Sequence, residues 1–346
     1  MFERAYALVP HTSKALVASL SGVPPPLDTR RTESEPDAIP ARCLPRLIED
    51  HGYRTAFFQS ATESFERHPQ LVENLGYEDF FATEDMSKAG YDKANYFGYE
   101  DDIMLEPSGE WLRQNSNEPF LATYLTVTAH HDYVVPRSFG EKKFVEDEEL
   151  NRYLNTVRYQ DHFLQNLFDQ YRELGLYDDT TFIVFGDHGE GFGEHGRYQH
   201  DNTIYEEGLR IPFLIHQPGR WEDGESIEQV VDELDLLPTV AELLGYEIQG
   251  GTYPGSSVLS PPACRTLMAS CYHEHTCLAS IRDDENYVYH YGNMADEYFD
   301  LSKDPYEHHN IIDQQDDEEI QNLCENLPAW ESRVQASYEP QTAARD

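Results

Sequence analysis

The strongest constraint on the fold is a short apolar run that ends in a loop of glycines and ionisable side chains. Residues 182–185 read Phe-Ile-Val-Phe, which is typical of a strand buried in an α/β sheet. The loop at 186–196 that follows is rich in glycine and carries Asp187, His188, Glu190, Glu194 and His195. Sheets of this class place their active sites at the carboxyl ends of strands, so this loop is a candidate site.

The residue types in this loop suit a divalent cation. An Asp beside a His offers the mixed oxygen and nitrogen ligands that such ions accept, and glycines let the backbone turn tightly around an ion. The alternative is a solvated polar turn, which explains the loop less well because simple capping does not need so many glycines.

The remaining pattern predicts an α/β fold with a mostly parallel central sheet flanked by helices, and a small C-terminal antiparallel sheet. Helical patterns alternate with strand patterns in the first part of the chain, the helices at 41–51 and 150–174 and the strands at 53–58, 121–128 and 180–186. After residue 262 the apolar runs become short and lie at 266–272, 277–282, 287–291 and 297–301. We expect a catalytic α/β domain at 1–261, an antiparallel meander at 262–312 and an acidic helical tail at 313–346.

Two further segments carry candidate site residues. The apolar spacing after His11 predicts a helix that begins at Thr12 or Ser13, where free N–H groups favour a bound anion. Ordinary N-capping explains this hydroxyl equally well. His130 and His131 follow the strand predicted at 121–128 and suit binding of an oxyanion or protonation of a leaving group, with plain surface histidines as an equal alternative.

The net charge of −40, from 65 Asp and Glu against 25 Lys and Arg, argues against nucleic acid or an anionic membrane as a partner. No apolar run approaches the roughly 20 residues of a membrane helix, and no secretory signal is visible. We therefore expect a cytoplasmic protein without a membrane span. The acidic, lysine-poor composition favours a halophilic protein over an ordinary acidic one, because carboxylates stay hydrated when salt screens their charge.

The cysteines do not form a recognisable disulfide framework. The chain has five of them, an odd number, and we expect mostly reduced thiols. Cys271, His273, His275 and Cys277 alternate along a predicted strand and raise the possibility of zinc. An extended strand would spread them over about 20 Å, too far for one tetrahedral shell, so we prefer half-buried strand residues.

Several motifs, taken in order, resemble the sulfatase branch of the alkaline phosphatase-like superfamily. The loop 187–196, followed by His200 and the strand at 210–215, is similar to the family's metal loop. Residues 51–56 resemble its Gly-Tyr-x-Thr-Ala turn, and residues 298–310 resemble its Tyr-Asp-Leu-x-x-Asp-Pro-x-Glu-x-x-Asn signature. The resemblance covers the chain from about residue 5 to about residue 312.

The resemblance implies a nucleophile about ten residues before Gly22, which is Thr12. Sulfatases that convert a Cys or Ser to formylglycine need that residue followed by an Arg, and here the segment reads Thr12-Ser13-Lys14-Ala15-Leu16. A Thr nucleophile is instead a property of the phosphodiesterase and phosphotransferase branch. The implied function is thus a metal-dependent hydrolase or transferase that cleaves phosphate mono- or diesters through a phospho-threonine, with a sulfuric ester hydrolase as the alternative.

The same resemblance assigns a role to each candidate residue. A divalent metal ion (Mn, Ca, Mg or Zn) would be held by Asp187, His188 and Thr12, and its chemistry would acidify the Thr12 hydroxyl. His130 and His200 would steady the substrate's oxygens. Substrate-binding residues would be Lys14, replacing the charge of the absent Arg, together with His131 and His195. The expected partner is a small-molecule, glycan-linked or lipid-linked phosphate or sulfate ester.

One departure from the family pattern gives a hypothesis of another class. Members take a further acidic metal ligand from a strand some tens of residues before the nucleophile, and only 11 residues precede Thr12. We expect this strand to be missing, through either a misplaced start or a natural truncation. A truncated chain would be a non-catalytic binding or interaction module.

Overall fold

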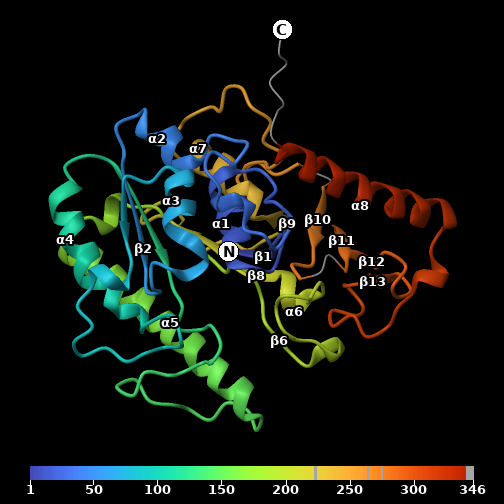
Figure 1. Ribbon diagram of the computed structural model, residues 1–346, viewed down its shortest axis with the longest axis horizontal. Coiled ribbons are helices and arrows are strands. Elements are labelled where there is room, and N and C mark those ends of the chain that lie inside the picture. Colours follow the sequence, from blue (N-terminus) through green and yellow to red (C-terminus); the bar gives the residue numbers. More distant parts are fainter. Residues whose placement is uncertain (222–223, 263–264, 274–275, 340–346) are drawn as a thin grey trace. The chain divides into compact units, whose positions relative to one another are not determined.

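The computed structural model describes residues 1–221, 224–262, 265–273 and 276–339, and these form two compact units. The first unit combines residues 1–44, 182–216 and 223–346, and the second combines 45–181 and 217–222. Each unit holds its own sheet (Figure 1). The parallel strands that we predicted as one central sheet are thus found in two sheets, and the predicted boundaries at 261 and 312 remain a prediction.

The main sheet of the first unit has the strand order β5-β8-β1-β9. Its strands are β1 (Phe2–Tyr6), β5 (Phe182–Phe185), β8 (Arg210–His216) and β9 (Ile227–Asp232). Strand β8 runs antiparallel to both of its neighbours and β1 runs parallel to β9, so β1, β5 and β9 all point the same way. Their carboxyl ends therefore meet at one edge of the sheet, and this edge positions the candidate site.

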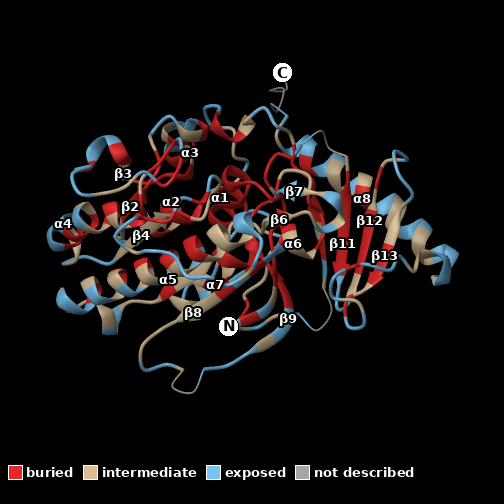
Figure 2. Cartoon of the chain, turned by 90° about the horizontal axis from the view of Figure 1, so that it is seen from below, coloured by how far each residue is buried: buried red, intermediate tan, exposed pale blue. Residues whose placement is uncertain are grey.

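Helix α1 (Thr12–Ser21) follows β1 and is buried along its whole length (Figure 2). It packs against a 3₁₀ turn (Glu233–Asp235) and helix α7 (Leu236–Leu243), both of which follow β9. The helix ends at Gly22, whose φ of 67° belongs to the left-handed region, and its N–H donates to the carbonyl of Ala18 at 3.0 Å. Helix α1 is therefore fixed in place behind the edge of the sheet.

A fully buried ion pair anchors the first turn of α1. The Nζ atom of Lys14 lies 2.7 Å from Oε2 of Glu33, and both side chains are completely buried. The hydroxyl of Ser13 donates to Oε1 of the same carboxylate at 2.7 Å. Glu33 thus satisfies both side chains, and Lys14 has its charge neutralised inside the protein.

The C-terminal part of the first unit is the antiparallel meander that the sequence predicted. Its strands run in the order β10-β11-β12-β13, with β10 (Thr266–Ser270), β11 (Leu278–Arg282), β12 (Glu285–Tyr289) and β13 (Glu297–Asp300). Alternate side chains divide between two cores, because successive residues of a strand point to opposite faces. Ala279, Ile281 and Val288 join Tyr6, whereas Leu278 and Tyr287 face helix α8 (Asp317–Ser337).

The second unit contains a three-stranded parallel sheet with the order β3-β2-β4. Its strands are β2 (Arg54–Gln59), β3 (Asp79–Phe81) and β4 (Phe120–Leu125), and its helices are α2 (Leu44–Glu49), α3 (His68–Leu75), α4 (Leu105–Asn115) and α5 (Glu148–Glu173). Helix α5 and strand β4 confirm the predicted elements at 150–174 and 121–128 to within a few residues. None of the helices in the described residues combines the length and apolar character that a membrane crossing needs.

The prediction of reduced thiols was wrong for one pair of cysteines. Cys271 and Cys277 form a disulfide with their Cα atoms 5.4 Å apart. They do not lie on one extended strand, because β10 ends at Ser270 and β11 begins at Leu278. The chain turns back between them, and the N–H of Cys271 donates to the carbonyl of Cys277 at 3.0 Å. His275, the other predicted zinc candidate with His273, lies outside the described residues.

The contacts of His195, called here the His195 clasp, join the loop after β5 to the segment that follows β13. His195 has Nδ1 2.9 Å from Oε1 of Glu207 and Nε2 3.0 Å from the carbonyl of Glu307, and its ring stacks on Tyr205. Burial works against a charged ring, but the Glu207 hydrogen bond and the Glu307 carbonyl raise the pKa of His195 to about 9. The loop and the meander are thus joined through a protonated histidine. Beside them lie the short elements β6 (Gly191–Phe192), β7 (Tyr198–Gln199) and α6 (Glu206–Leu209).

We expect Glu33→Gln to lower the free energy of unfolding by about 3 kcal/mol, because it leaves the Lys14 ammonium buried without its counter-charge. The double variant Lys14→Met/Glu33→Leu removes both charges and should recover most of this loss. Urea unfolding at neutral pH measures both. Equal instability of the single and double variants would contradict the assignment of the loss to an unpaired charge.

We expect the His195 clasp to make stability depend on pH. Since folding raises the pKa of His195 from 6.5 to about 9, its contribution is complete below about pH 6.5 and disappears as the pH rises through 9. The melting temperature of His195→Gln should therefore fall less between pH 6.5 and 9 than that of the parent. His309→Gln, at an exposed histidine, is the control and should keep the parent's slope.

Candidate functional site

Thr12 lies at the first position of α1 and directs its hydroxyl to the neighbouring strand end. The N-cap residue is His11, which has extended backbone and no side-chain cap. Oγ1 of Thr12 donates to Oδ2 of Asp187 at 2.7 Å. The hydroxyl therefore does not serve as the cap of α1, and the capping alternative is wrong. Thr12 and Asp187 follow β1 and β5, so the shared direction of these strands brings them together.

Asp187 is ionised and partly open to solvent. Its side chain is 36% exposed, and its Oδ1 accepts the N–H of His188 at 3.1 Å. Partial removal from solvent raises the pKa of Asp187, but the ring of His188 and the hydrogen bond from Thr12 outweigh it and hold that pKa below its usual value. A carboxylate of this kind can hold the Thr12 proton at Oδ2 and leave the oxygen lone pairs of Thr12 available for attack.

His188 presents a free nitrogen beside this pair. Its Nδ1 lies 2.8 Å from the carbonyl of Gly189, which fixes the proton on Nδ1. Its Nε2 is 3.5 Å from Oδ2 of Asp187 and has no hydrogen-bond partner among the described residues, although it is buried. A buried nitrogen that lacks a partner needs an explanation, and an ion or a ligand supplies one.

His200 completes the group in the first unit. Its ring stacks on that of His188 with centroids 4.0 Å apart. Its Nδ1 lies 3.2 Å from Oε1 of Glu190, and its Nε2 is 3.7 Å from Oδ1 of Asp201. Glu190 therefore orients the imidazole and leaves Nε2 on the opposite side of the ring. The structure thus gathers four of the predicted site residues, namely Thr12, Asp187, His188 and His200.

Two other residues of this unit that were predicted to bind substrate, Lys14 and His195, instead bind groups of the protein itself. The Lys14 ammonium is fully buried against Glu33, so it does not replace the charge of the absent arginine. His195 has both ring nitrogens bonded within the clasp, so neither nitrogen is left for a substrate. We assign structural roles to both residues. Sequence reasoning could not find these roles because Glu33 and Glu307 lie far from them along the chain.

His130 and His131 belong to the second unit and stay predictions. They follow β4 in a loop fixed by Asp101, whose Oδ1 accepts the N–H of Val127 at 2.8 Å and that of Thr128 at 3.3 Å. Burial raises the pKa of the Asp101 carboxyl to about 6, although these hydrogen bonds act to lower that pKa. His130 donates its N–H to the carbonyl of Val127, and the two histidine rings lie 4.0 Å apart.

Sequence reasoning missed Glu233, a buried carboxyl group at the carboxyl end of β9. Its Oε2 accepts the N–H of Leu8 at 3.1 Å, and its Oε1 is buried without a hydrogen-bond partner among the described residues. Burial raises the pKa of Glu233 well above its usual value, and the charge of Asp187 raises it further. The available signal was its place directly after β9, since Asp187 also lies within two residues of the end of its strand, β5.

The predicted metal ligands Asp187, His188 and Thr12 offer donor atoms of the kinds that a divalent ion accepts. In the part of the chain that the structure describes, no group of three or more His, Cys, Asp or Glu side chains is placed to hold a metal ion. Asp187, His188 and Thr12 nevertheless fit one, since they bring together a carboxylate, an unpartnered ring nitrogen and a hydroxyl. These residues would hold a divalent ion.

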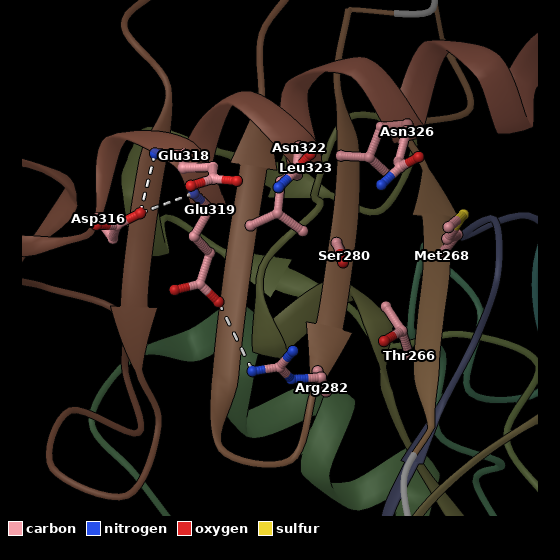
Figure 3. Close-up of a pocket in the computed structure, with 11 residues that line it drawn as sticks. Thr266, Met268, Ser280, Arg282, Asp316, Glu318, Glu319, Asn322, Leu323 and Asn326 are labelled. Carbon is pink, nitrogen blue, oxygen red and sulfur yellow. Dashed lines mark hydrogen bonds and ion pairs between the residues drawn. The ribbon is translucent and has the colours of Figure 1, made fainter.

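A pocket of about 490 Å³ lies between α8 and the meander (Figure 3). Arg282 points toward Glu319 across it, and Asp316 accepts the N–H groups of Glu318 and Glu319 in the first turn of α8. Its wall also includes Ser280 and Asn326. None of the predicted site residues lines this pocket, so it is separate from the Thr12 site.

Comparisons with known proteins identify the family to which the chain belongs. A sulfatase family model matches residues 1–246, and a model described as N-sulphoglucosamine sulphohydrolase, C-terminal, matches residues 193–332. The lipoteichoic acid synthase-like YvgJ of Bacillus subtilis is 28% identical over 233 residues, which is 62% of this chain and 36% of that protein. The chain spans about a third of the length of the curated relatives it matches.

Solved structures share the fold at low sequence identity. The lipoteichoic acid synthase LtaP from Listeria monocytogenes is 19% identical with a TM-score of 0.77, over 98% of this chain and 83% of that one. The phosphonate monoester hydrolase of Agrobacterium radiobacter is 15% identical with a TM-score of 0.64, over 97% and 88%. The fold is thus alkaline phosphatase-like, and the extent of the sulfatase match shows that the chain belongs to the sulfatase family.

Proposed function

We propose that the chain is a metal-dependent ester hydrolase or transferase that cleaves phosphate esters with Thr12 as its nucleophile. The observation that carries this proposal is the 2.7 Å hydrogen bond from the Thr12 hydroxyl to Asp187, at the edge where β1 and β5 end. Relatives named as a lipoteichoic acid synthase and a phosphonate monoester hydrolase support the phosphorus branch.

The chain's own residues account for most of the proposed reaction. Asp187 holds the proton of Thr12 at Oδ2 and orients Oγ1 toward the substrate. Oγ1 attacks phosphorus, the bond from phosphorus to the leaving oxygen breaks, and Nε2 of His200 faces the departing oxygen as a proton donor. A divalent ion held by Asp187, His188 and Thr12 would supply positive charge that acidifies the hydroxyl.

The second half of the reaction returns the enzyme to its starting state. Water or an acceptor alcohol attacks the phospho-threonine, the bond from Oγ1 to phosphorus breaks, and Thr12 regains its proton. Water gives a hydrolase, and an alcohol gives a transferase. Small-molecule, glycan-linked and lipid-linked esters are all compatible with this scheme.

Two alternatives are favoured by separate observations. Hydrolysis of a sulfate ester is supported by the sulphohydrolase match at residues 193–332, but Thr12 stands where formylglycine would have to form. A non-catalytic binding module is supported by the described residues, among which no group of three or more His, Cys, Asp or Glu side chains is placed to hold a metal ion. Both alternatives are separated from the proposal by the same assay.

We expect Thr12→Ala to lower turnover of a phosphate ester by about a thousandfold or more, because it removes the attacking oxygen. The assay uses chromogenic phosphodiester, phosphomonoester and sulfate-ester substrates in high KCl with added Mn²⁺, Ca²⁺, Mg²⁺ or Zn²⁺. Ser19→Ala is the matched control, since this hydroxyl of the same helix donates only to the carbonyls of Ala15 and Leu16.

The outcomes separate the three hypotheses. Turnover of a phosphate ester that survives Ser19→Ala and disappears in Thr12→Ala supports the proposal. Turnover limited to the sulfate ester favours the sulfuric ester hydrolase. A folded parent that turns over no ester with any of the metals supports the non-catalytic module, and undiminished turnover in Thr12→Ala excludes Thr12 as the nucleophile.

A further inference from the structure

The pocket between α8 and the meander is lined by several polar side chains that bind nothing else in the protein. They are Thr266 of β10, Ser280 of β11, and Asn322 and Asn326 of α8. None of these side chains makes a hydrogen bond to another residue within the ranges that the structure describes. Their hydrogen-bonding groups are therefore available to an occupant of the pocket.

Ser280 carries the most weight among them because it is buried. The residue is only 5% exposed, and its strand β11 is hydrogen-bonded to β10 on one side and β12 on the other. Its hydroxyl nevertheless lines the pocket without a partner among the described residues. Nearly all buried polar atoms of side chains have a hydrogen-bond partner, either in the protein or outside it. The Ser280 hydroxyl thus points to a partner from outside the chain.

The sheet and the helix place these polar groups on facing walls. Thr266 and Ser280 belong to neighbouring strands whose pairing puts both side chains on the face toward α8. Asn322 and Asn326 are one helical turn apart, on the side of α8 that faces the strands (Figure 3). Hydroxyl and carboxamide groups both donate and accept hydrogen bonds. The two walls therefore suit a ligand whose own groups do both.

The charges around the pocket disfavour an anionic ligand. Its lining includes Asp316, Glu318 and Glu319 together with Arg282. Nη2 of Arg282 lies 3.1 Å from Oε2 of Glu285 and 3.7 Å from Oε1 of Glu319, so carboxylates already balance its charge. A phosphate or sulfate group would meet a net negative charge here. The pocket is therefore unsuited to be a second site for an anionic ester.

The remaining features favour a sugar over a peptide. Met268, Leu323 and Leu327 add an apolar part to the lining, and the volume of about 490 Å³ lies in the range of small-molecule sites. A neutral sugar unit carries hydroxyl groups around a ring with apolar C–H faces, which matches both parts of this lining. The strands meet the pocket with their side-chain face, whereas an added peptide strand binds at the edge of a sheet.

We propose that this pocket binds a neutral sugar unit through the hydroxyl of Ser280 and the carboxamides of Asn322 and Asn326. The inference goes beyond the proposed function and does not depend on it, because no residue of the Thr12 site takes part. It gives the chain a second binding site, whose ligand is recognised by hydroxyl groups and not by a phosphate or sulfate group.

Saturation-transfer difference NMR in high KCl tests the proposal, with methyl glucoside, methyl galactoside and N-acetylglucosamine as probes. We expect at least one of them to bind the parent, and to bind Ser280→Ala and Asn322→Ala about three- to tenfold more weakly, because each variant loses a hydrogen bond to the sugar. Asn322 is exposed on α8, so its variant keeps the fold even if that of Ser280 does not. Gln321→Ala is the matched control, since that side chain donates to Glu325 and does not line the pocket.

Two further probes test the class of ligand. Glucose 6-phosphate should bind more weakly than methyl glucoside because of the carboxylates around the pocket, and a neutral tripeptide with blocked ends should not bind. The proposal is overturned if none of the named sugars binds, if both variants bind them as the parent does, or if the tripeptide binds in their place. Asn322→Ala should turn over esters as the parent does, so this test and that of Thr12 succeed or fail independently.

Discussion

The hydrogen bond between the Thr12 hydroxyl and Asp187 depends on the direction in which three strands run. Because β8 is antiparallel to both β5 and β1, the ends of β5 and β1 come together although their residues are far apart in the sequence. Strand β9 brings Glu233 to the same edge. The buried Lys14–Glu33 pair then prevents α1 from shifting, so the first residue of that helix stays at the sheet edge.

Sequence patterns predicted the parts of this site that are encoded locally. The apolar run before Asp187, the start of a helix at Thr12 and the family motif around His200 each lie within a few residues of the side chain concerned. The fold class followed from the same local periodicities, since strand and helix repeats are read over short windows. These predictions did not depend on knowing which residues, distant in the sequence, contact these side chains in the fold.

The features that sequence reasoning missed are pairings across the chain. Lys14 was expected to contact the substrate, but its partner Glu33 lies in a single 3₁₀ turn (Thr32–Ser34) that is too short to show a periodic pattern. His195 meets the carbonyl of Glu307, 112 residues away. Glu233 was overlooked because its hydrogen bond with the N–H of Leu8 spans 225 residues of the chain. The Cys271–Cys277 pair likewise required the turn between β10 and β11 to be known.

The acidity of the chain bears on how an anionic ester could bind at all. A net charge of −40 repels anions at long range, and the lysine nearest to Thr12 in sequence is neutralised. Salt removes the long-range part, since the screening length falls to about 3 Å at 1 M. What remains acts at contact distance: the free N–H groups at the start of α1, whose first turn contains no acidic residue, and the divalent cation that the proposed function requires. For a chain of this charge, a cation at Asp187 and His188 would therefore serve the proposed binding of an anionic ester as well as the proposed attack by Thr12.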